Sequence, residues 1–198
     1  DFTITNGSGD WAGGLSNEYN SNPTVILRNL IVSGNNSSGN AGGIEFKNGT
    51  ITMDDLIVEN NFGQEIGGIS LQTDGSIKNT IVRNNSAHAS QAGGISLAFG
   101  TADLINVLVA ENDLENNTGL FSTGGVAINN GSYNFINTTI VNNTGDNYGG
   151  IRTRSEVTLN ILNSIIFNNS GRQVTVSNDE DQTIIGVYNS NIEGGNEQ

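Results

Sequence analysis

This sequence has few of the residues that form disulfides, rigid turns and ion pairs in other domains. Its 198 residues include no Cys and 1 Pro, and only 14% of them are charged. The lack of Cys excludes a disulfide framework and any thiolate chemistry. Basic residues number 7 against 20 acidic ones, which gives a formal net charge of −13. Because phosphate neutralisation needs clustered Lys and Arg, we expect no nucleic-acid partner.

Long apolar runs and helical periodicity are also missing. No run approaches the roughly 18 apolar residues of a membrane span, so no membrane-spanning segment is expected. Apolar residues do not recur at helical spacing over more than about two turns. Present instead are 27 Gly, many Asn, Ser and Thr, and a hydrophobic fraction of 34% dominated by Ile, Val and Leu. This composition favours short β-strands around a narrow core.

A Gly-Gly pair followed by an aliphatic residue occurs six times. The pairs begin at Gly13, Gly42, Gly67, Gly93, Gly124 and Gly149, at spacings of 29, 25, 26, 31 and 25 residues. A second motif, such as "DLIVENN" from Asp55 or "NTIVRNN" from Asn79, recurs between the pairs. Two motifs that keep step through insertions of varying length indicate a structural repeat. We therefore expect residues 1–198 to form a single repeat array.

Each repeat contains three short strand-like runs separated by Gly, Asp and Asn. In the second complete repeat the runs are Ile44-Glu45-Phe46, Ile51-Thr52-Met53 and Leu56-Ile57-Val58. Alternation places one set of apolar side chains on a common side. Three strands with one shared inward face predict an all-β parallel β-helix, or solenoid, of about seven coils, with strands stacked ~4.8 Å apart.

With these motifs the sequence resembles the right-handed parallel β-helix of the pectin-lyase-like superfamily. It is most similar to the repeats of polymorphic outer-membrane proteins and related surface adhesins, which also carry a Gly-Gly-aliphatic element and an Asn-rich turn. The resemblance implies a right-handed coil and an extracellular or cell-surface location. It does not select a function, because one fold hosts many functions.

Stacked Asn residues are expected at one turn of every coil. Their amides can donate and accept hydrogen bonds along the stack and can satisfy the bent backbone. The predicted inward ladder comprises Asn29, Asp55, Asn79, Asn106, Asn137, Asn163 and Asn189. A second Asn column, from Asn35 to Asn169, is expected where the third strand ends. The Gly-Gly pairs are expected to allow positive φ and close approach between coils.

One column of aliphatic residues conflicts with a solvated outer surface. Alternation directs Ile31, Ile57, Ile81, Leu108 and Ile165, with Thr139 among them, away from the core. An exposed apolar column suggests an interface with another copy or a neighbouring domain. The alternatives are a different register at the bend, or a neighbouring segment that covers the column.

No acid–base constellation is evident on the outer positions of the first strand. One outward column runs from Glu45 to Arg152 and the next from Lys47 to Arg154. Neither brings together two carboxylates, as paired-carboxylate hydrolysis requires. Asp54 and Asp55 are adjacent and are interpreted as a solvated corner. His88 has no second His or Cys nearby in sequence, which disfavours a metal or base role.

Three residues are candidates for ligand binding, and three others are candidates for calcium binding. Arg152 and Arg154 share one face and can hold a carboxylate or sulfate, or form a simple solvated pair. Trp11 either stacks on a sugar ring or caps the first coil. Asp179, Glu180 and Asp181 form the densest acidic run and suit calcium, although the spacing of a defined calcium loop is missing. No other cofactor is expected.

The chain starts and stops in the same phase of the repeat, which suggests a piece of a longer rod or a subunit that stacks head to tail. We therefore expect a non-enzymatic, extracellular structural or adhesive module that self-associates or adjoins neighbouring domains. The alternative is a carbohydrate-active or glycan-binding domain on the same scaffold.

Overall fold

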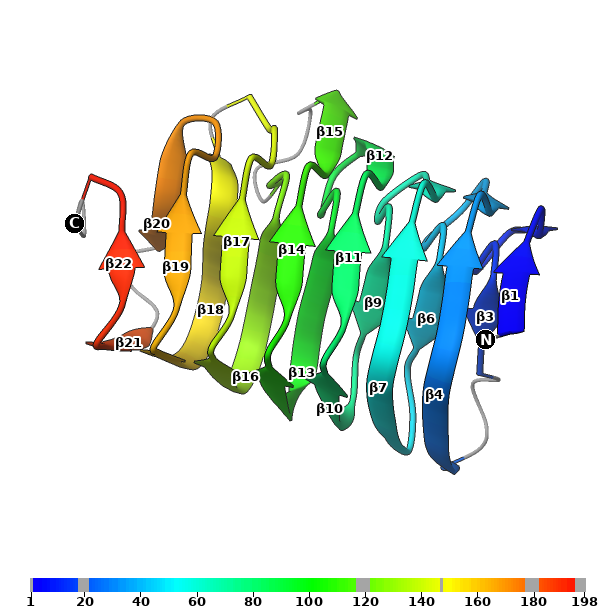
Figure 1. The fold of residues 1–198 in the computed structure, drawn as a ribbon, viewed down its shortest axis with the longest axis horizontal. Helices are drawn as coiled ribbons and strands as arrows, with labels where there is room; N and C mark the ends of the chain where they lie inside the picture. Colours follow the sequence, from blue (N-terminus) through cyan, green and yellow to red (C-terminus); the bar gives the residue numbers. More distant parts are fainter. Residues whose placement is uncertain (1, 18–21, 117–121, 147, 177–181, 195–198) are drawn as a thin grey trace.

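The computed structural model describes residues 2–17, 22–116, 122–146, 148–176 and 182–194. All regular elements in these ranges are strands, and they stack into a parallel β-solenoid of about seven turns (Figure 1). The predicted all-β parallel β-helix is therefore confirmed. Strands β1 (Phe2–Thr5) and β22 (Asn191–Ile192) lie at opposite ends of the stack.

Three faces run along the stack. The first contains β3 (Leu15–Ser16), β6 (Ile44–Phe46), β9 (Ile69–Leu71), β20 (Arg172–Val176) and the first parts of β13 (Ile95–Ile105), β16 (Val126–Ile136) and β18 (Tyr148–Leu162). The second contains the remainders of β13, β16 and β18, the first halves of β4 (Thr24–Ser33) and β7 (Thr50–Glu59), β10 (Asp74–Lys78) and β21 (Ile184–Tyr188). The third contains β1, the second halves of β4 and β7, β11 (Ile81–Arg83), β14 (Leu108–Ala110), β17 (Thr139–Val141), β19 (Ile165–Phe167) and β22. A small separate sheet contains β2 (Ser8–Gly9), β5 (Asn36–Ser37), β8 (Phe62–Gly63), β12 (Ser86–Ala89) and β15 (Asp113–Asn116).

Several of the predicted short runs join into one bent strand. In β7 the second and third runs are continuous through Asp55, which has a φ of 59°. Pairing with β4 continues on both sides of this residue, as Arg28 with Asp54 and Leu30 with Leu56. A single residue with positive φ thus turns the chain from one face to the next while the neighbouring coils stay paired.

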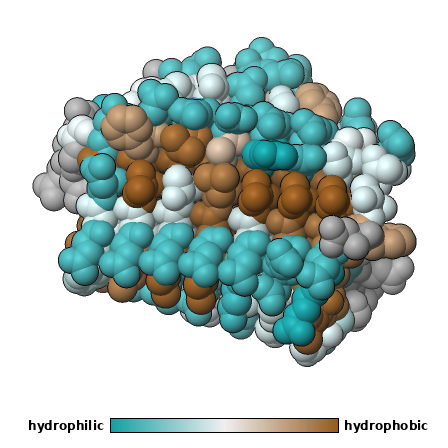
Figure 2. Space-filling model, viewed as in Figure 1, coloured by the Kyte–Doolittle hydropathy of each residue, from teal (hydrophilic) through white to brown (hydrophobic). Residues whose placement is uncertain are grey.

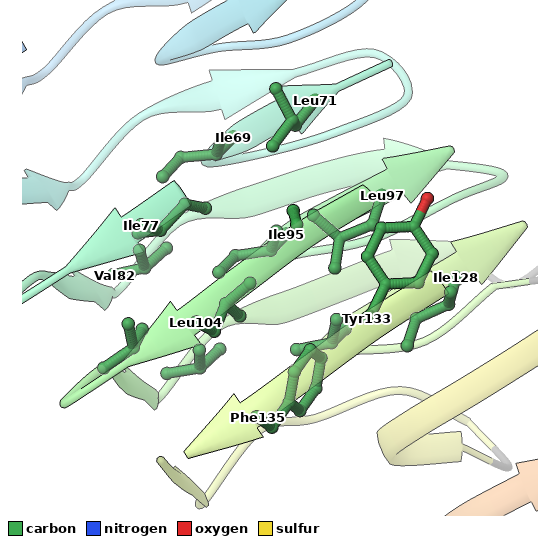
Figure 3. Packing of buried hydrophobic residues seen from close by; sticks show 14 of the residues in the cluster. Ile69, Leu71, Ile77, Val82, Ile95, Leu97, Leu104, Ile128, Tyr133 and Phe135 are labelled. Carbon is green, nitrogen blue, oxygen red and sulfur yellow. The ribbon is translucent and has the colours of Figure 1, made fainter. Parts of the chain in front are cut away.

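The core fills the narrow interior between the faces. In β7, Ile51, Met53, Leu56 and Val58 are fully buried and alternate with half-buried or exposed residues, as the period of two predicts. Figure 3 shows the same arrangement further along the stack, where side chains from β9, β13 and β16 meet. Each coil therefore buries its apolar side chains against those of the coils before and after it.

The Gly-Gly pairs lie where neighbouring coils approach most closely. A Cβ atom on Gly68 would lie 2.5 Å from the carbonyl oxygen of Gly94 and 2.9 Å from Cγ1 of Val82. The predicted close approach is confirmed. The predicted positive φ is wrong, because the glycines with φ in that region are elsewhere, at Gly34, Gly49 and three other positions outside the pairs. Steric exclusion of a side chain, and not backbone freedom, therefore explains the glycine requirement.

Candidate functional site

A continuous ladder of buried asparagines runs through the solenoid beside the third face. Its members each stand after the third strand of a coil, at Asn35, Asn61, Asn85, Asn112, Asn143 and Asn169. The Nδ2 atom of Asn61 donates to Oδ1 of Asn85 at 3.0 Å and to the carbonyl oxygen of Val32 at 2.9 Å, and its backbone N–H donates to the same Oδ1 at 3.1 Å. The pattern repeats along the column until Asn169 donates to Oε1 of Gln173 at 2.7 Å. Each amide therefore joins three successive coils.

The column predicted to form the inward ladder lies on the outside instead. Its members are exposed and have φ between 47° and 59°, at Asn29, Asp55, Asn79, Asn106, Asn137, Asn163 and Asn189. Some still bond along the column, since Nδ2 of Asn106 donates to Oδ1 of Asn79 at 3.1 Å. The inward placement was wrong because Asn suits this corner through its tolerance of left-handed backbone, whereas the buried amides belong to the second Asn column.

The predicted apolar column does point outward from the third face. Ile57 pairs laterally with Ile31 and with Ile81, and the column continues through Leu108, Thr139 and Ile165. Most members are half-buried by their neighbours, and Ile165 is 47% exposed. Figure 2 shows an apolar row across this face beside a row of hydrophilic residues. The orientation is as expected, and the interface role stays a prediction.

Trp11 belongs to a charged cluster at the N-terminal end of the first face. Nζ of Lys47 lies 4.6 Å from the centroid of the indole and 2.8 Å from Oε1 of Glu45. Glu45 is only 2% exposed and also accepts from Nδ2 of Asn40. Burial raises the pKa of Glu45, and the neighbouring Lys47 partly offsets this shift. Trp11 itself is 63% exposed, so its indole covers a cation and does not close the core.

The first face also carries a groove of about 430 Å³. It lies over β9, β13, β16 and β18 and is lined by Gln72, Ser90, Gln91, Ser96, Ala98, Phe99, Ala127, Ile128, Asn129, Arg152 and Arg154. The two predicted Arg ligands are thus brought together, while Trp11 is not among the lining residues. The hydroxyl of Ser96 donates to Oε1 of Gln91 at 3.0 Å, and Nε2 of Gln91 donates to Glu65 at 2.7 Å. These bonds fix one wall of the groove.

Arg152 is held in place by its surroundings. Its guanidinium carbon lies 3.8 Å from the centroid of the Tyr148 ring, and Nη1 donates to the carbonyl oxygen of Ser122 at 3.4 Å. Only 8% of the residue is exposed, and burial lowers its pKa, although a guanidinium remains protonated throughout the neutral range. Arg154, two residues further on the same outward side, is exposed. The groove therefore ends in one fixed and one exposed cation.

Phe99 is a groove residue that sequence reasoning missed. It is 66% exposed and has a φ of 57°. At the equivalent turn, between the first and second faces, the next two coils have Asn130 in β16 and Ser155 in β18, with φ of 60° and 61°. A left-handed conformation costs a bulky residue roughly 1–2 kcal/mol. Alignment of the repeats could have identified Phe99, because an aromatic residue stands there at a position where the next repeat has Asn.

Other residues considered in the sequence do not line the groove. Nδ1 of His88 lies 3.7 Å from Oε2 of Glu115, on an exposed edge. Asp54 lies 3.6 Å from Nε of Arg28, while Asp55 occupies the corner, which agrees with the interpretation of that pair. The described ranges contain no group of three or more His, Cys, Asp or Glu residues that can hold a metal. The predicted calcium ligands Asp179, Glu180 and Asp181 lie outside these ranges.

Within the part of the chain that the structure describes, no helix has the length and apolar character needed to cross a membrane. No protein-family model, curated protein or solved structure matches this chain.

Proposed function

We propose that this chain is a non-enzymatic structural and adhesive module of an extracellular or cell-surface protein. The observation that supports this most strongly is the buried asparagine ladder. Each amide ties three coils together, so bending or separating any two coils leaves buried donors without acceptors, which is costly. A rod built in this way keeps its length and presents its outer columns at a fixed spacing. Such rigidity suits a spacer or a surface that carries binding groups.

The chemistry of the groove also supports binding without catalysis. Amide, hydroxyl, guanidinium and aromatic groups line it, and these groups bind ligands through hydrogen bonds, charge and apolar contact. A guanidinium does not exchange its proton near neutral pH and is therefore a poor general acid or base. In this proposal the chain is a β-helix of the pectin-lyase-like kind, similar to outer-membrane-protein repeats, and needs no cofactor. Its outward apolar column contacts a neighbouring domain or a second copy.

Turnover of polysaccharides tests the proposal against the enzymatic alternative. The purified chain is incubated with neutral and acidic polysaccharides, with and without calcium, and new reducing ends and unsaturated products are measured. We expect no product in either condition. Product that disappears in an Arg152→Ala variant with unchanged circular dichroism would show that the chain is an enzyme, and would overturn the proposal.

A further inference from the structure

The groove exists because one outward column of the first face carries small side chains on three successive coils, from Ser70 to Ala127. On the first face, Ser96 pairs laterally with Ala127, and Ala127 pairs with Arg152. In the adjacent outward column Ala98 precedes Asn129. Since neighbouring coils are only ~4.8 Å apart, short side chains in these columns leave a hollow that longer ones would fill. The hollow has Gln72 on its N-terminal side and the two arginines on its C-terminal side.

The electrostatic character of the groove differs from that of the whole chain. The sequence has 20 acidic and 7 basic residues, yet two of those basic residues, Arg152 and Arg154, line this one groove. Among the described residues that line it, none is Asp or Glu. Guanidinium groups bind carboxylate and sulfate through parallel hydrogen bonds, and a partly enclosed site strengthens that attraction. The C-terminal wall therefore favours an oxyanion.

Phe99 gives the groove a flat apolar surface. Its ring is exposed although its backbone adopts a conformation that Asn and Gly tolerate far better. Backbone strain at an exposed aromatic residue calls for an explanation beyond folding, because both features disfavour Phe at this turn. A ring that packs against the apolar face of a ligand provides one. The amides of Gln72 and Asn129 add donors and acceptors for hydroxyl groups.

We propose that this groove binds a short oligosaccharide bearing a carboxylate or sulfate, with one sugar ring against Phe99 and its anionic group toward Arg152 and Arg154. The volume of about 430 Å³ lies in the range of roughly 300–1,000 Å³ typical of small-molecule sites. The site is distinct from the cluster of Trp11, Lys47 and Glu45. It is also independent of the rod's structural role, because none of the groove's side chains belongs to the buried asparagine ladder.

Calorimetric titration with three probes tests the proposal. The probes are a galacturonic acid trimer, a galactose disaccharide that carries sulfate and no carboxylate, and the same galactose disaccharide without sulfate. We expect at least one acidic probe to bind at least about tenfold more tightly than the neutral one, with weaker binding at higher salt. Comparing the carboxylated and sulfated probes identifies the anion. Equal affinity for acidic and neutral probes, or no binding of any probe at millimolar concentration, overturns the proposal.

Two variants localise the binding. Phe99→Asn introduces the residue that the next repeat has at this turn. We therefore expect a variant that is at least as stable as the wild type but binds the acidic probes about tenfold less tightly. Arg154→Gln removes an exposed cation, and we expect a similar loss confined to acidic probes. Arg83→Gln, on the third face, is the matched control and should bind as the wild type does. Unchanged binding in both groove variants contradicts the assignment.

Discussion

Replacing Asn85 with Ala removes one member of the buried asparagine ladder, and the loss in the free energy of unfolding measures what that member contributes to stability. The side chain accepts from the backbone N–H and from Nδ2 of Asn61 at 3.1 and 3.0 Å, and it donates to Val58 and Asn112 at 2.9 and 3.0 Å. Truncation leaves two donors of Asn61 buried without acceptors. At about 1–3 kcal/mol for each, the free energy of unfolding falls by about 2–6 kcal/mol. This is a large part of the 5–15 kcal/mol typical of whole domains.

Two companion variants separate hydrogen bonding from the cavity that Ala leaves. Asn85→Asp keeps the shape but has one donor when protonated and none when ionised, and burial disfavours ionisation of its carboxyl group. Its pKa in the folded state therefore lies above the unfolded value of about 3.9, so the stability deficit relative to the wild type grows as pH rises from about 4. Asn79→Gly, in the exposed column, keeps the positive φ and should cost at most about 1 kcal/mol.

Equilibrium urea unfolding followed by circular dichroism measures all three variants. The reasoning is refuted if Asn85→Ala costs less than about 1 kcal/mol, or if Asn79→Gly costs as much as Asn85→Ala. It is also refuted if the deficit of Asn85→Asp is the same at pH 4 and pH 7, since the carboxyl group at this position would then have the same pKa in the folded and unfolded states, which a buried site does not allow.

Three further predictions concern other parts of the rod. Gly68→Ala should lower the free energy of unfolding, measured by urea denaturation, by at least about 1–3 kcal/mol, because the new Cβ would lie 2.5 Å from the carbonyl oxygen of Gly94. An unchanged free energy of unfolding would contradict the close approach. Because burial raises the pKa of Glu45, the wild type should lose stability relative to Glu45→Gln as pH rises through that pKa. A difference in melting temperature between the two proteins that stays constant from pH 4 to 7 would contradict this. Ile81→Ser should abolish concentration-dependent association seen by light scattering with calcium present, whereas a wild type that stays monomeric at high concentration would refute the predicted interface.

The repeat could be predicted from the sequence because it rests on local chemistry repeated many times. Every Gly-Gly pair and every aliphatic alternation reports the same coil, so insertions between them do not hide the period. The inward direction of residues such as Ile44 and Met53 follows from strand alternation alone. These features depend on neighbours in sequence and on the stacking of equivalent positions, both of which the sequence shows.

The two asparagine columns could not be distinguished by residue type. Asn serves a buried ladder through its amide and serves an exposed corner through its tolerance of positive φ, and both columns repeat with the same period. The one available signal was Asp55. A carboxylate cannot donate along a buried ladder but fits an exposed corner, and the column from Asn35 to Asn169 has no such exception.

The groove was hidden for a different reason. The outward residues Ser96 and Ala127 were recognised, but they were interpreted only as the absence of catalytic acids. Their small size produces a hollow because larger residues surround it in space, and those neighbours come from other coils and turns. Phe99 contributes only through the direction in which its turn places the ring. Such shapes depend on turn geometry that periodicity does not encode.

Amide hydrogen exchange tests most directly whether the buried asparagine ladder holds the rod together. The backbone N–H groups of Asn61, Asn85 and Asn112 are buried and donate to the next Asn Oδ1 at 3.1, 3.1 and 3.0 Å. We predict that all three exchange only through global unfolding, with opening free energies equal to the free energy of unfolding measured in urea. Opening free energies several kcal/mol below that value would show that the ladder opens by local unfolding, and would contradict the claim that it holds the coils of the solenoid together.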